Sequence, residues 1–396
     1  MARPEYGNSI VEIPGTVSEL LDGESNLGSL DKIERYENVE NVVLIFIDAF
    51  GYSQWKNFDS GLFRKAEENG ELHKITSTFP SATPATLTSV NTGLQPVEHS
   101  LLGWEMYYEE LDMIIQTLPF ADRDWIPIKD IVEDADPSIL FEGEAFHSIL
   151  ENEGISTYGI PKEEVKDSEY SNLVTGEETE TRPYNNIAEM AFKVREVLNQ
   201  ESGKKYIYAY TDLIDKTCHE YGPGSEEEKV QLENISDSLN RELGKVDEEV
   251  AKETLVLFSA DHGQIKASEE IDLMKYEEVE KRLEERDGRP ITPCGSARSV
   301  FVHVKGGEVE DLKEFLEKEI DAEIYRTEKA VEKGLFGDRE IGENFYSRAG
   351  ELLIIPNGRK AYWYDTDEYE QEGFHGGLHE DEMFVPFALS RLSELL

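Results

Sequence analysis

The sequence has little of what marks secreted, membrane-spanning or nucleic-acid-binding proteins. Only two cysteines occur in 396 residues, too few for a disulfide framework. No apolar run approaches the roughly 20 residues that span a bilayer, and residues 1–6 lack the apolar core of a signal peptide. We therefore expect a cytoplasmic protein with no membrane partner.

Basic residues are also scarce. Lys and Arg number 39 against 85 Asp and Glu, which gives a formal net charge of −46. Such a surface repels nucleic-acid polymers and anionic membranes. Acidic residues crowd helix-like stretches such as 225–228 and 277–280, so we interpret them as solvated faces. The composition resembles that of halophilic proteins from a salt-rich cytoplasm, where screening weakens self-repulsion. Nothing in the sequence specifies an oligomeric state.

Hydrophobic residues make up 38% of the chain, but they gather in short runs. Residues 42–47 and 255–258 are apolar, and 205–211, which lies between them in the chain, is a strand-like run rich in tyrosine. These runs predict strands buried in a mostly parallel α/β sheet. Helices are expected over 60–69 and 225–247. The pattern changes over 267–346, with a strand at 299–304 and a helix near 310–319. We predict a small inserted α/β cap there, and a core formed by 1–266 and 347–396, with 351–355 returning to the core sheet.

Acidic and imidazole side chains stand where two of these strands end. Asp48 closes the first run, and Asp261 and His262 follow the third. The carboxyl ends of parallel strands are where open α/β sheets bind ligands. Asp and His are also good ligands for zinc-like ions. The alternative for each segment alone is an ordinary turn or helix cap.

Two further segments carry the same residue types. Asp215 and His219 are four residues apart after the second strand, so a helix there would place both on one face. Asp212 is the competing carboxylate, but it lies two helical turns from His219. His375 is flanked by glycines that allow close backbone approach. The remaining histidines are interpreted as structural; these are His73, His99, His147, His303 and His379.

Thr83 is the candidate nucleophile. Thr83 and Pro84 read as the N-cap and first residue of a helix that stops near Gly93. The free N–H groups at such a start favour an anion such as phosphate. A hydroxyl held there beside a metal can be ionised and can attack. The alternative is a hydroxyl that only caps the helix.

In this order the motifs resemble the type I phosphodiesterase/nucleotide pyrophosphatase family of the alkaline phosphatase superfamily. The motifs are a strand ending in Asp48, Thr83 opening a helix that leads to Thr-Gly-Leu-x-Pro-x-x-His, Asp-x-x-x-His-x-x-Gly-Pro from Asp215, Asp-His-Gly from Asp261, and His-Gly at His375. The resemblance implies a three-layer α/β/α core of the alkaline phosphatase type and a two-metal site, usually zinc.

The resemblance also implies roles for these residues. Asp215, His219 and His375 would hold one divalent ion, and Asp48, Asp261 and His262 the other, with Thr83 beside it as metal-contacting nucleophile. The implied reaction is hydrolysis of phosphodiester or pyrophosphate bonds in small, nucleotide-type molecules through a covalent threonine intermediate. Thr86, Tyr107 and Tyr108 are candidate substrate contacts, as are Phe120 and Trp125; core packing is the alternative for the aromatic residues.

Two departures from the family pattern leave nucleotide specificity open. Thr86 stands where nucleotide pyrophosphatases often carry Asn, and Gly103-Trp104 lies near where a second Asn is expected. The sulfatase alternative is disfavoured, because Cys294–Arg298 lacks the required Pro and follows the Asp261 strand. No Arg occurs between Arg64 and Arg123 to clamp a monoester dianion, which favours a diester. A phosphomonoesterase and a non-catalytic metal-binding protein of the same fold remain the alternatives.

Overall fold

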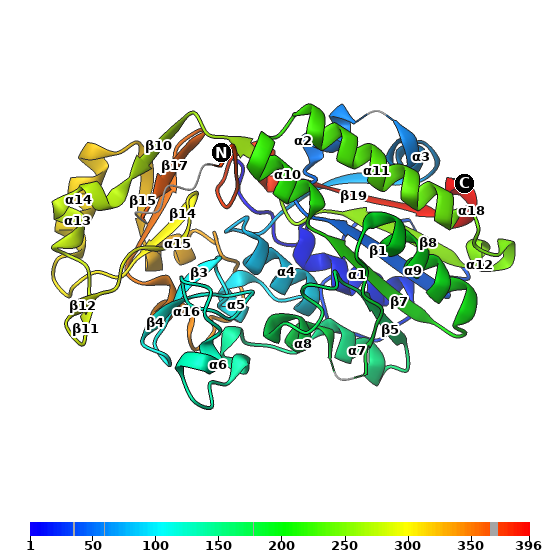
Figure 1. Cartoon of the computed structure of the whole chain (residues 1–396), viewed down its shortest axis with the longest axis horizontal. Helices are drawn as coiled ribbons and strands as arrows, with labels where there is room; N and C mark the ends of the chain where they lie inside the picture. Colours follow the sequence, from blue (N-terminus) through cyan, green and yellow to red (C-terminus); the bar gives the residue numbers. More distant parts are fainter. Residues whose placement is uncertain (35, 59, 177, 365–370) are drawn as a thin grey trace.

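The computed structural model describes residues 1–34, 36–58, 60–176, 178–364 and 371–396. Its strands form two main sheets that lie side by side along the long axis of the molecule (Figure 1). The larger sheet has helices on both faces, and the second sheet forms a separate lobe.

The larger sheet confirms the predicted α/β architecture. It has seven strands in the order β2-β19-β8-β1-β7-β5-β6. The strands from β8 to β6 run parallel, whereas β19 is antiparallel to both β8 and β2. The strand bounds are β1 Asn41–Ile47, β2 Glu71–Thr76, β5 Ser156–Ile160, β6 Glu180–Thr181, β7 Lys205–Thr211, β8 Thr254–Ser259 and β19 Phe384–Arg391.

Strand β1 lies at the centre of this sheet, between β7 and β8. All seven of its residues are buried, as are all six of β8. Strands covered on both faces need apolar side chains in both directions, which explains their unbroken apolar runs. The three strands are in register, with Phe46 opposite both Tyr210 and Ser259. Their carboxyl ends therefore finish at the same edge.

Helices cover both faces of the sheet (Figure 1). One layer contains α2 Tyr52–Asn57, α3 Gly61–Asn69, α9 Ile187–Gln200, α10 Leu213–Tyr221, α11 Glu226–Leu243, α12 Glu248–Lys252 and α18 Leu392–Leu395. The opposite layer contains α1 Ile13–Leu20, α4 Thr83–Thr92, α5 Pro96–His99, α7 Phe146–Asn152 and α8 Glu169–Thr175. The predicted helices over 60–69 and 225–247 correspond to α3 and α11. The Ser225 side chain caps α11 by accepting the Glu228 N–H.

The second sheet has six strands in the order β15-β16-β14-β13-β3-β4, and its pairings are antiparallel. Its strands are β3 Glu105–Tyr108, β4 Met113–Gln116, β13 Cys294–Ser296, β14 Ser299–Val302, β15 Ala322–Arg326 and β16 Leu352–Pro356. The helices of this part are α6 Ile128–Ile131, α13 Glu277–Glu280, α14 Val309–Glu319, α15 Thr327–Glu332 and α16 Phe345–Ala349. Three two-stranded pairs complete the strands: β9 Ile265–Lys266 with β18 Gly373–Phe374, β10 Glu269–Asp272 with β17 Lys360–Trp363, and β11 Glu285–Arg286 with β12 Arg289–Pro290.

The predicted return of 351–355 to the core sheet is wrong. These residues form β16, which pairs with β14 and β15 in the second sheet. All five residues of β16 are buried. Its apolar run therefore resembles that of a core strand, and the sequence does not indicate which strands it pairs with. Strands β3 and β4, from before the predicted insertion, join the same sheet. The division at 267–346 remains a prediction.

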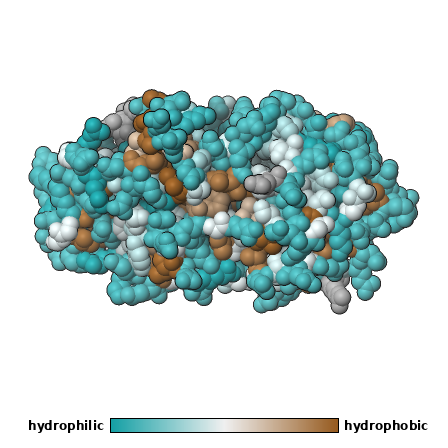
Figure 2. Space-filling view, turned by 90° about the horizontal axis from the view of Figure 1, so that it is seen from below, coloured by the Kyte–Doolittle hydropathy of each residue, from teal (hydrophilic) through white to brown (hydrophobic). Residues whose placement is uncertain are grey.

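One face of the molecule is largely hydrophilic (Figure 2). On the face shown in Figure 2 the atoms are mainly hydrophilic, and apolar atoms form small separate patches. No described helix is both long and apolar enough to cross a membrane. Cys218 and Cys294 are free and buried.

Candidate active site

The ends of the three central strands bring the candidate ligands together. Asp48 directly follows β1, and Asp261 and His262 follow β8. Strand β7 leads into α10, which carries Asp215 and His219 on successive turns. His375 follows β18, which pairs with β9 immediately beyond the Asp261–His262 turn. Segments that are more than 300 residues apart along the chain thus converge on one sheet edge.

The first group consists of Asp48, Asp261 and His262. All three side chains are buried. The Nε2 atom of His262 lies 3.5 Å from Asp48 Oδ1 and 3.3 Å from Asp261 Oδ2. One ligand atom from each residue lies within 4.8 Å of the others. The group therefore has the residue types and spacing to hold one metal ion.

Backbone geometry fixes the two carboxylates of this group. Ala49 adopts a left-handed conformation with φ of 62°, and its N–H donates to Asp261 Oδ1 at 3.0 Å. The His262 N–H donates to the same oxygen at 2.8 Å. The Tyr210 hydroxyl donates to Asp48 Oδ2. The other oxygen of each carboxylate is buried and has no hydrogen-bond partner in the described part of the chain.

These unpartnered oxygens fit a cation. Burial raises the pKa of Asp48 well above its usual range, and the nearby charge of Asp261 raises it further. Burial also raises the pKa of Asp261 to about 6. Two buried carboxylates at such close range are unfavourable unless a proton or a cation compensates them. A divalent ion would supply that charge.

The second group consists of Asp215, His219 and His375. Asp215 Oδ1 lies 3.3 Å from His219 Nε2 and 3.7 Å from His375 Nε2. The Gln264 side-chain amide donates to Asp215 Oδ1 and holds the carboxylate from the other side. The two groups are in contact, because the rings of His262 and His375 stack with centroids 3.7 Å apart.

Backbone carbonyls orient all three imidazoles in the same way. His219 Nδ1 lies 2.8 Å from the Gly373 carbonyl, His262 Nδ1 lies 3.0 Å from the Gly263 carbonyl, and His375 Nδ1 lies 3.1 Å from the Ser81 carbonyl. Since a carbonyl only accepts, each contact assigns the proton to Nδ1. In the neutral form of each ring, Nε2 would then carry the lone pair and lie beside the carboxylates, which is the arrangement that ligating histidines use.

Burial also sets the charge of these rings. It lowers the pKa of His262 to about 4 and that of His375 to about 3, the latter with a contribution from His262. For His219 burial acts in the same direction, but the Asp215 carboxylate outweighs it and raises the pKa. Burial would raise the pKa of Asp215, but the His219 imidazole overrides it and the pKa is lowered. Near neutral pH, His262 and His375 are thus neutral, as metal ligation requires.

Thr83 lies beside the first group. Its Oγ1 is 3.1 Å from His262 Nε2. The predicted N-cap role is wrong by one residue: Ala82 is the N-cap, Thr83 is the first residue of α4, and no side-chain cap is formed. The expected stop is confirmed, since Gly93 ends the helix with φ of 74°. The Thr83 hydroxyl is therefore directed at the candidate ligands rather than used to cap the helix.

Two cavities meet at Thr83. The larger, about 540 Å³, is lined by Thr83, Asp48 and Asp215 and extends to Asn91 and Tyr208. The smaller, about 320 Å³, is lined by Thr83, Asp215, His219 and His375 and extends to Tyr364.

Trp104 and Trp125 line both cavities, with ring centroids 6.4 Å apart. They are 37% and 58% exposed, so they form an aromatic rim that a substrate can contact. The sequence pointed to Trp125 as a rim candidate, whereas Trp104 was noted only as a departure from the family pattern.

The larger cavity also contains cationic side chains. Lys162, Lys166 and Lys216 contribute to its lining. Asp212, the competing carboxylate of the sequence analysis, pairs with Lys162 at 2.9 Å and with Lys216 at 2.8 Å. Asp212 therefore lies in the cavity wall, outside both ligand groups.

Three predicted substrate contacts lie elsewhere. Tyr107 and Tyr108 are buried in β3, where their hydroxyls donate to Asp112 Oδ1 and to the Leu140 carbonyl. Thr86 is buried in α4 and donates to the Ala82 and Thr83 carbonyls. None of the three lines either cavity at Thr83. Phe120, a further rim candidate, is also buried and absent from both linings.

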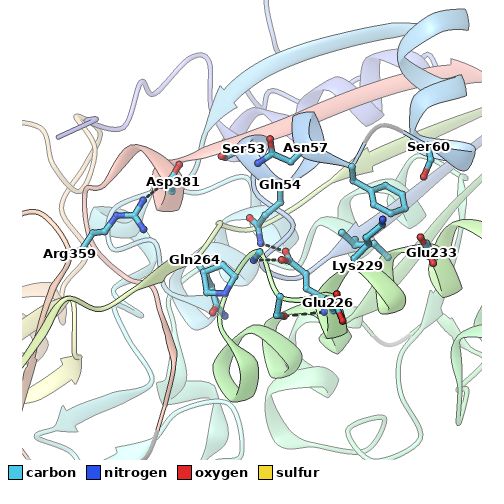
Figure 3. Close-up of a pocket in the computed structure, with 16 residues that line it drawn as sticks. Ser53, Gln54, Asn57, Ser60, Glu226, Lys229, Glu233, Gln264, Arg359 and Asp381 are labelled. Atoms are coloured by element: carbon cyan, nitrogen blue, oxygen red, sulfur yellow. Dashed lines mark hydrogen bonds and ion pairs between the residues drawn. The ribbon is translucent and has the colours of Figure 1, made fainter.

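Tyr210 and Gln264 are contributors that sequence reasoning missed. Tyr210 belongs to a strand with Tyr at every second position, a pattern that predicts packing. Gln264 lies one residue beyond the Asp-His-Gly motif, and its amide reaches Asp215. It also lines a separate polar cavity of about 730 Å³, together with Gln54, Arg359 and Asp381. Figure 3 shows that cavity, with the Arg359 and Asp381 side chains directed at each other.

The fold and these groups define an α/β protein with a candidate metal centre of the kind that metal-dependent hydrolases use. The sequence model of the family "Type I phosphodiesterase / nucleotide pyrophosphatase" matches residues 42–378. The chain therefore belongs to this family of hydrolases, which confirms the resemblance seen in its motifs. A search of curated protein sequences found no significant match.

Solved structures show the same alkaline-phosphatase-like fold. Murine ectonucleotide pyrophosphatase/phosphodiesterase 5, as an inactive variant in complex with AMP, is similar with a TM-score of 0.65 and 16% identity over 88% of this chain and 87% of that chain. Phosphonoacetate hydrolase from Sinorhizobium meliloti 1021, in complex with phosphonoacetate, gives a TM-score of 0.65 and 15% identity over 90% and 92%.

Proposed function

We propose that this protein is a two-metal hydrolase that cleaves phosphodiester or pyrophosphate bonds of small molecules through a covalent intermediate on Thr83. One observation carries the proposal: two Asp/His ligand groups, in contact through His262 and His375, share a site with the Thr83 hydroxyl. Family membership supports the reaction class.

Zinc is the metal we propose, because mixed carboxylate and imidazole ligands suit it. Asp48, Asp261 and His262 would hold one ion and Asp215, His219 and His375 the other. Bound there, the ions would lower the pKa of the Thr83 hydroxyl and offset charge on the phosphoryl and leaving-group oxygens.

The protein's own residues position the nucleophile. The Thr83 oxygen forms a bond to phosphorus as the bond to the leaving-group oxygen breaks, and the hydroxyl proton is lost to solvent. Water then attacks phosphorus, breaks its bond to Thr83 and releases the product with Thr83 regenerated. Helix α4 begins at Thr83, and the free N–H groups at a helix N-terminus would favour the negative charge of a phosphoryl group there.

The two cavities favour a substrate with a substituent on each side of phosphorus. Each cavity includes Thr83, so one substituent can occupy each. No arginine lines either cavity among the described residues, so the arginine clamp expected for a monoester dianion is missing there. Of the lysines in the larger cavity, Lys162 and Lys216 are paired with Asp212. The structures with AMP and with a phosphonate show that proteins of this fold hold nucleotides or phosphonates. We propose the aromatic rim of Trp104 and Trp125 as the contact for a planar substituent.

The diester preference can be measured directly. We expect kcat/KM for bis(4-nitrophenyl) phosphate to exceed that for 4-nitrophenyl phosphate by about tenfold or more with the same zinc loading, since one absent charge clamp is worth at least about 1.4 kcal/mol. Trp125→Ala should raise KM for the diester. A ratio that favours the monoester would move the protein to the phosphomonoesterase alternative, and no turnover of either would favour the non-catalytic alternative.

We further propose that the protein works in a salt-rich cytoplasm. The charge of −46 repels itself at low ionic strength, and a Debye length of about 3 Å at 1 M salt removes most of that repulsion. The melting temperature should therefore rise as KCl increases from 0.05 M to 2 M. A melting temperature that stays constant or falls over that range would contradict the salt adaptation.

A further inference from the structure

Arg298 and Glu382 form a buried ion pair between the two sheets. Their side chains are 1% and 0% exposed. Arg298 donates to Glu382 through Nε at 3.1 Å and through a terminal nitrogen at 2.7 Å, one contact to each carboxylate oxygen. Arg298 lies in the turn between β13 and β14 of the second sheet, whereas Glu382 lies in α17 Glu380–Met383, just before core strand β19.

Glu382 also holds the backbone beside both candidate ligand groups. Its Oε1 accepts the Gly377 N–H at 2.9 Å, and Gly377 is two residues after His375. Its backbone carbonyl accepts the Gly263 N–H at 2.9 Å, and Gly263 directly follows His262. One residue is thus bonded close to a histidine from each group.

The loop that carries His375 has little freedom to move. Gly376 has φ of 111°, and a Cβ there would lie 2.2 Å from Ser296 Oγ, on the same turn as Arg298. The Ser81 hydroxyl donates to the Gly377 carbonyl at 2.8 Å, and the Ser81 carbonyl accepts from His375 Nδ1. A shift of the Arg298 turn would therefore be transmitted to His375.

Stability alone is a weak explanation for this pair. Taking two charges out of water costs about as much as their attraction returns, and apolar replacements of buried ion pairs are often neutral or stabilising. The Arg298 guanidinium also donates to the Gly358 and Lys360 carbonyls, so its position is fixed by several contacts. Groups just behind metal ligands fix ligand orientation, and their loss typically weakens metal binding by about 10–100-fold.

We propose that the Arg298–Glu382 pair is a positioning device that ties the second sheet to the metal-binding loops and sets the orientation of His375. The inference rests on the proposed function in taking His375 as a metal ligand. It also gives a role to the Cys294–Arg298 segment, which the sulfatase comparison left unexplained.

The test is zinc titration of the metal-free full chain, with the double variant Arg298→Met/Glu382→Met beside the wild type. Removing both charges leaves no unpaired buried charge, but the Gly377 N–H and the Gly358 and Lys360 carbonyls lose side-chain partners. The melting temperature should therefore fall, and zinc affinity is compared at a temperature where both proteins are folded. Zinc affinity at the Asp215–His219–His375 group should fall by about 10–100-fold. Affinity at the Asp48–Asp261–His262 group should change by less than about threefold, because the Glu382 backbone bond to Gly263 survives any side-chain change.

Arg348→Met/Glu110→Met is the control for loss of an ion pair elsewhere in the second lobe. Arg348 lies in α16, is also 1% exposed and pairs at 3.0 Å with Glu110, which is 34% exposed and lies between β3 and β4, outside both ligand groups. Both zinc affinities should stay at the wild-type value there. Wild-type zinc affinity in the folded Arg298→Met/Glu382→Met variant would overturn the inference.

If the double variant does not fold, the same zinc titration is made with Arg298→Lys. Lysine keeps the charge but cannot reproduce the two-nitrogen contact, so zinc affinity at the His375 group should fall by about tenfold; unchanged affinity would overturn the inference. If the wild type binds two zinc ions and these variants do not change zinc affinity, only the positioning role is refuted. Absence of zinc binding by the wild type would refute the proposed function as well.

Discussion

Replacing Thr83 with alanine should reduce turnover of a phosphodiester by about 10³-fold or more while zinc content and folding stay near those of the wild type. A nucleophile is indispensable to covalent catalysis, and its loss commonly removes most of the rate. The Thr83 hydroxyl caps no helix N–H, so the free energy of unfolding should change by less than about 1 kcal/mol. The measurement is single-turnover kinetics with zinc analysis of the same sample.

Thr86→Ala is the matched control for that experiment. Thr86 lies one turn further along α4, and its hydroxyl donates only to backbone carbonyls. Its loss should change turnover by less than about threefold, although the sequence suggested a substrate contact there. Thr83→Ser should retain measurable turnover. Full activity in Thr83→Ala would eliminate Thr83 as the nucleophile.

Replacing Asp261 with asparagine should have opposite effects on function and on the stability of the metal-free protein. The variant should lose zinc at the first group and at least about 100-fold of turnover. The metal-free variant at pH 8 should be more stable than the metal-free wild type by about 2–3 kcal/mol. The reason is that burial raises the Asp261 pKa from 3.8 to about 6, and each pKa unit is worth about 1.4 kcal/mol.

The sign of this effect can be checked by pH. A carboxyl whose folded-state pKa is raised destabilises the folded state when it is ionised, so the penalty on the wild type is complete above pH 6 and fades toward pH 4. The advantage of Asp261→Asn should therefore shrink over that range. Excess zinc should reverse the order, since a ligand at about 1,000 times its Kd adds about 4 kcal/mol to the wild type. The free energy of unfolding can be measured by chemical denaturation of both proteins at pH 8 with chelator, at pH 4–6 with chelator, and with excess zinc.

Asp212→Asn is the control for charge alone. Asp212 lines the same cavity, but Lys162 and Lys216 compensate its charge. Its replacement should leave zinc content unchanged and should not stabilise the metal-free protein. A metal-free Asp261→Asn protein that is less stable than the wild type at pH 8 would contradict the account of Asp48 and Asp261 as two uncompensated buried carboxylates.

The positions of Asp48 and Asp261 at strand ends could be predicted from the sequence because their signal is local. Asp48 and Asp261 end unbroken apolar runs, and strands buried on both faces produce such runs in any α/β sheet. The four-residue spacing of Asp215 and His219 places them on one face of α10, as expected. The Asp-His-Gly and His-Gly motifs follow in the order that the family shows. This order indicated the family, and the match to the family's sequence model confirmed it.

Other features depend on tertiary contacts that no local pattern encodes. The run over 352–356 is as apolar as a core strand, yet its partners are β14 and β15. Tyr107 and Tyr108 were suggested as a substrate rim, but alternation along β3 cannot tell which face the core covers. Gln264 contacts Asp215 from outside every motif.

The most direct test of the two-metal account is anomalous diffraction at the zinc edge from a crystal of the zinc-loaded protein. We predict two peaks about 4 Å apart, one contacted by Asp48, Asp261 and His262 and the other by Asp215, His219 and His375, with Thr83 Oγ beside the first. A single peak, or peaks bound by other residues, would contradict the account.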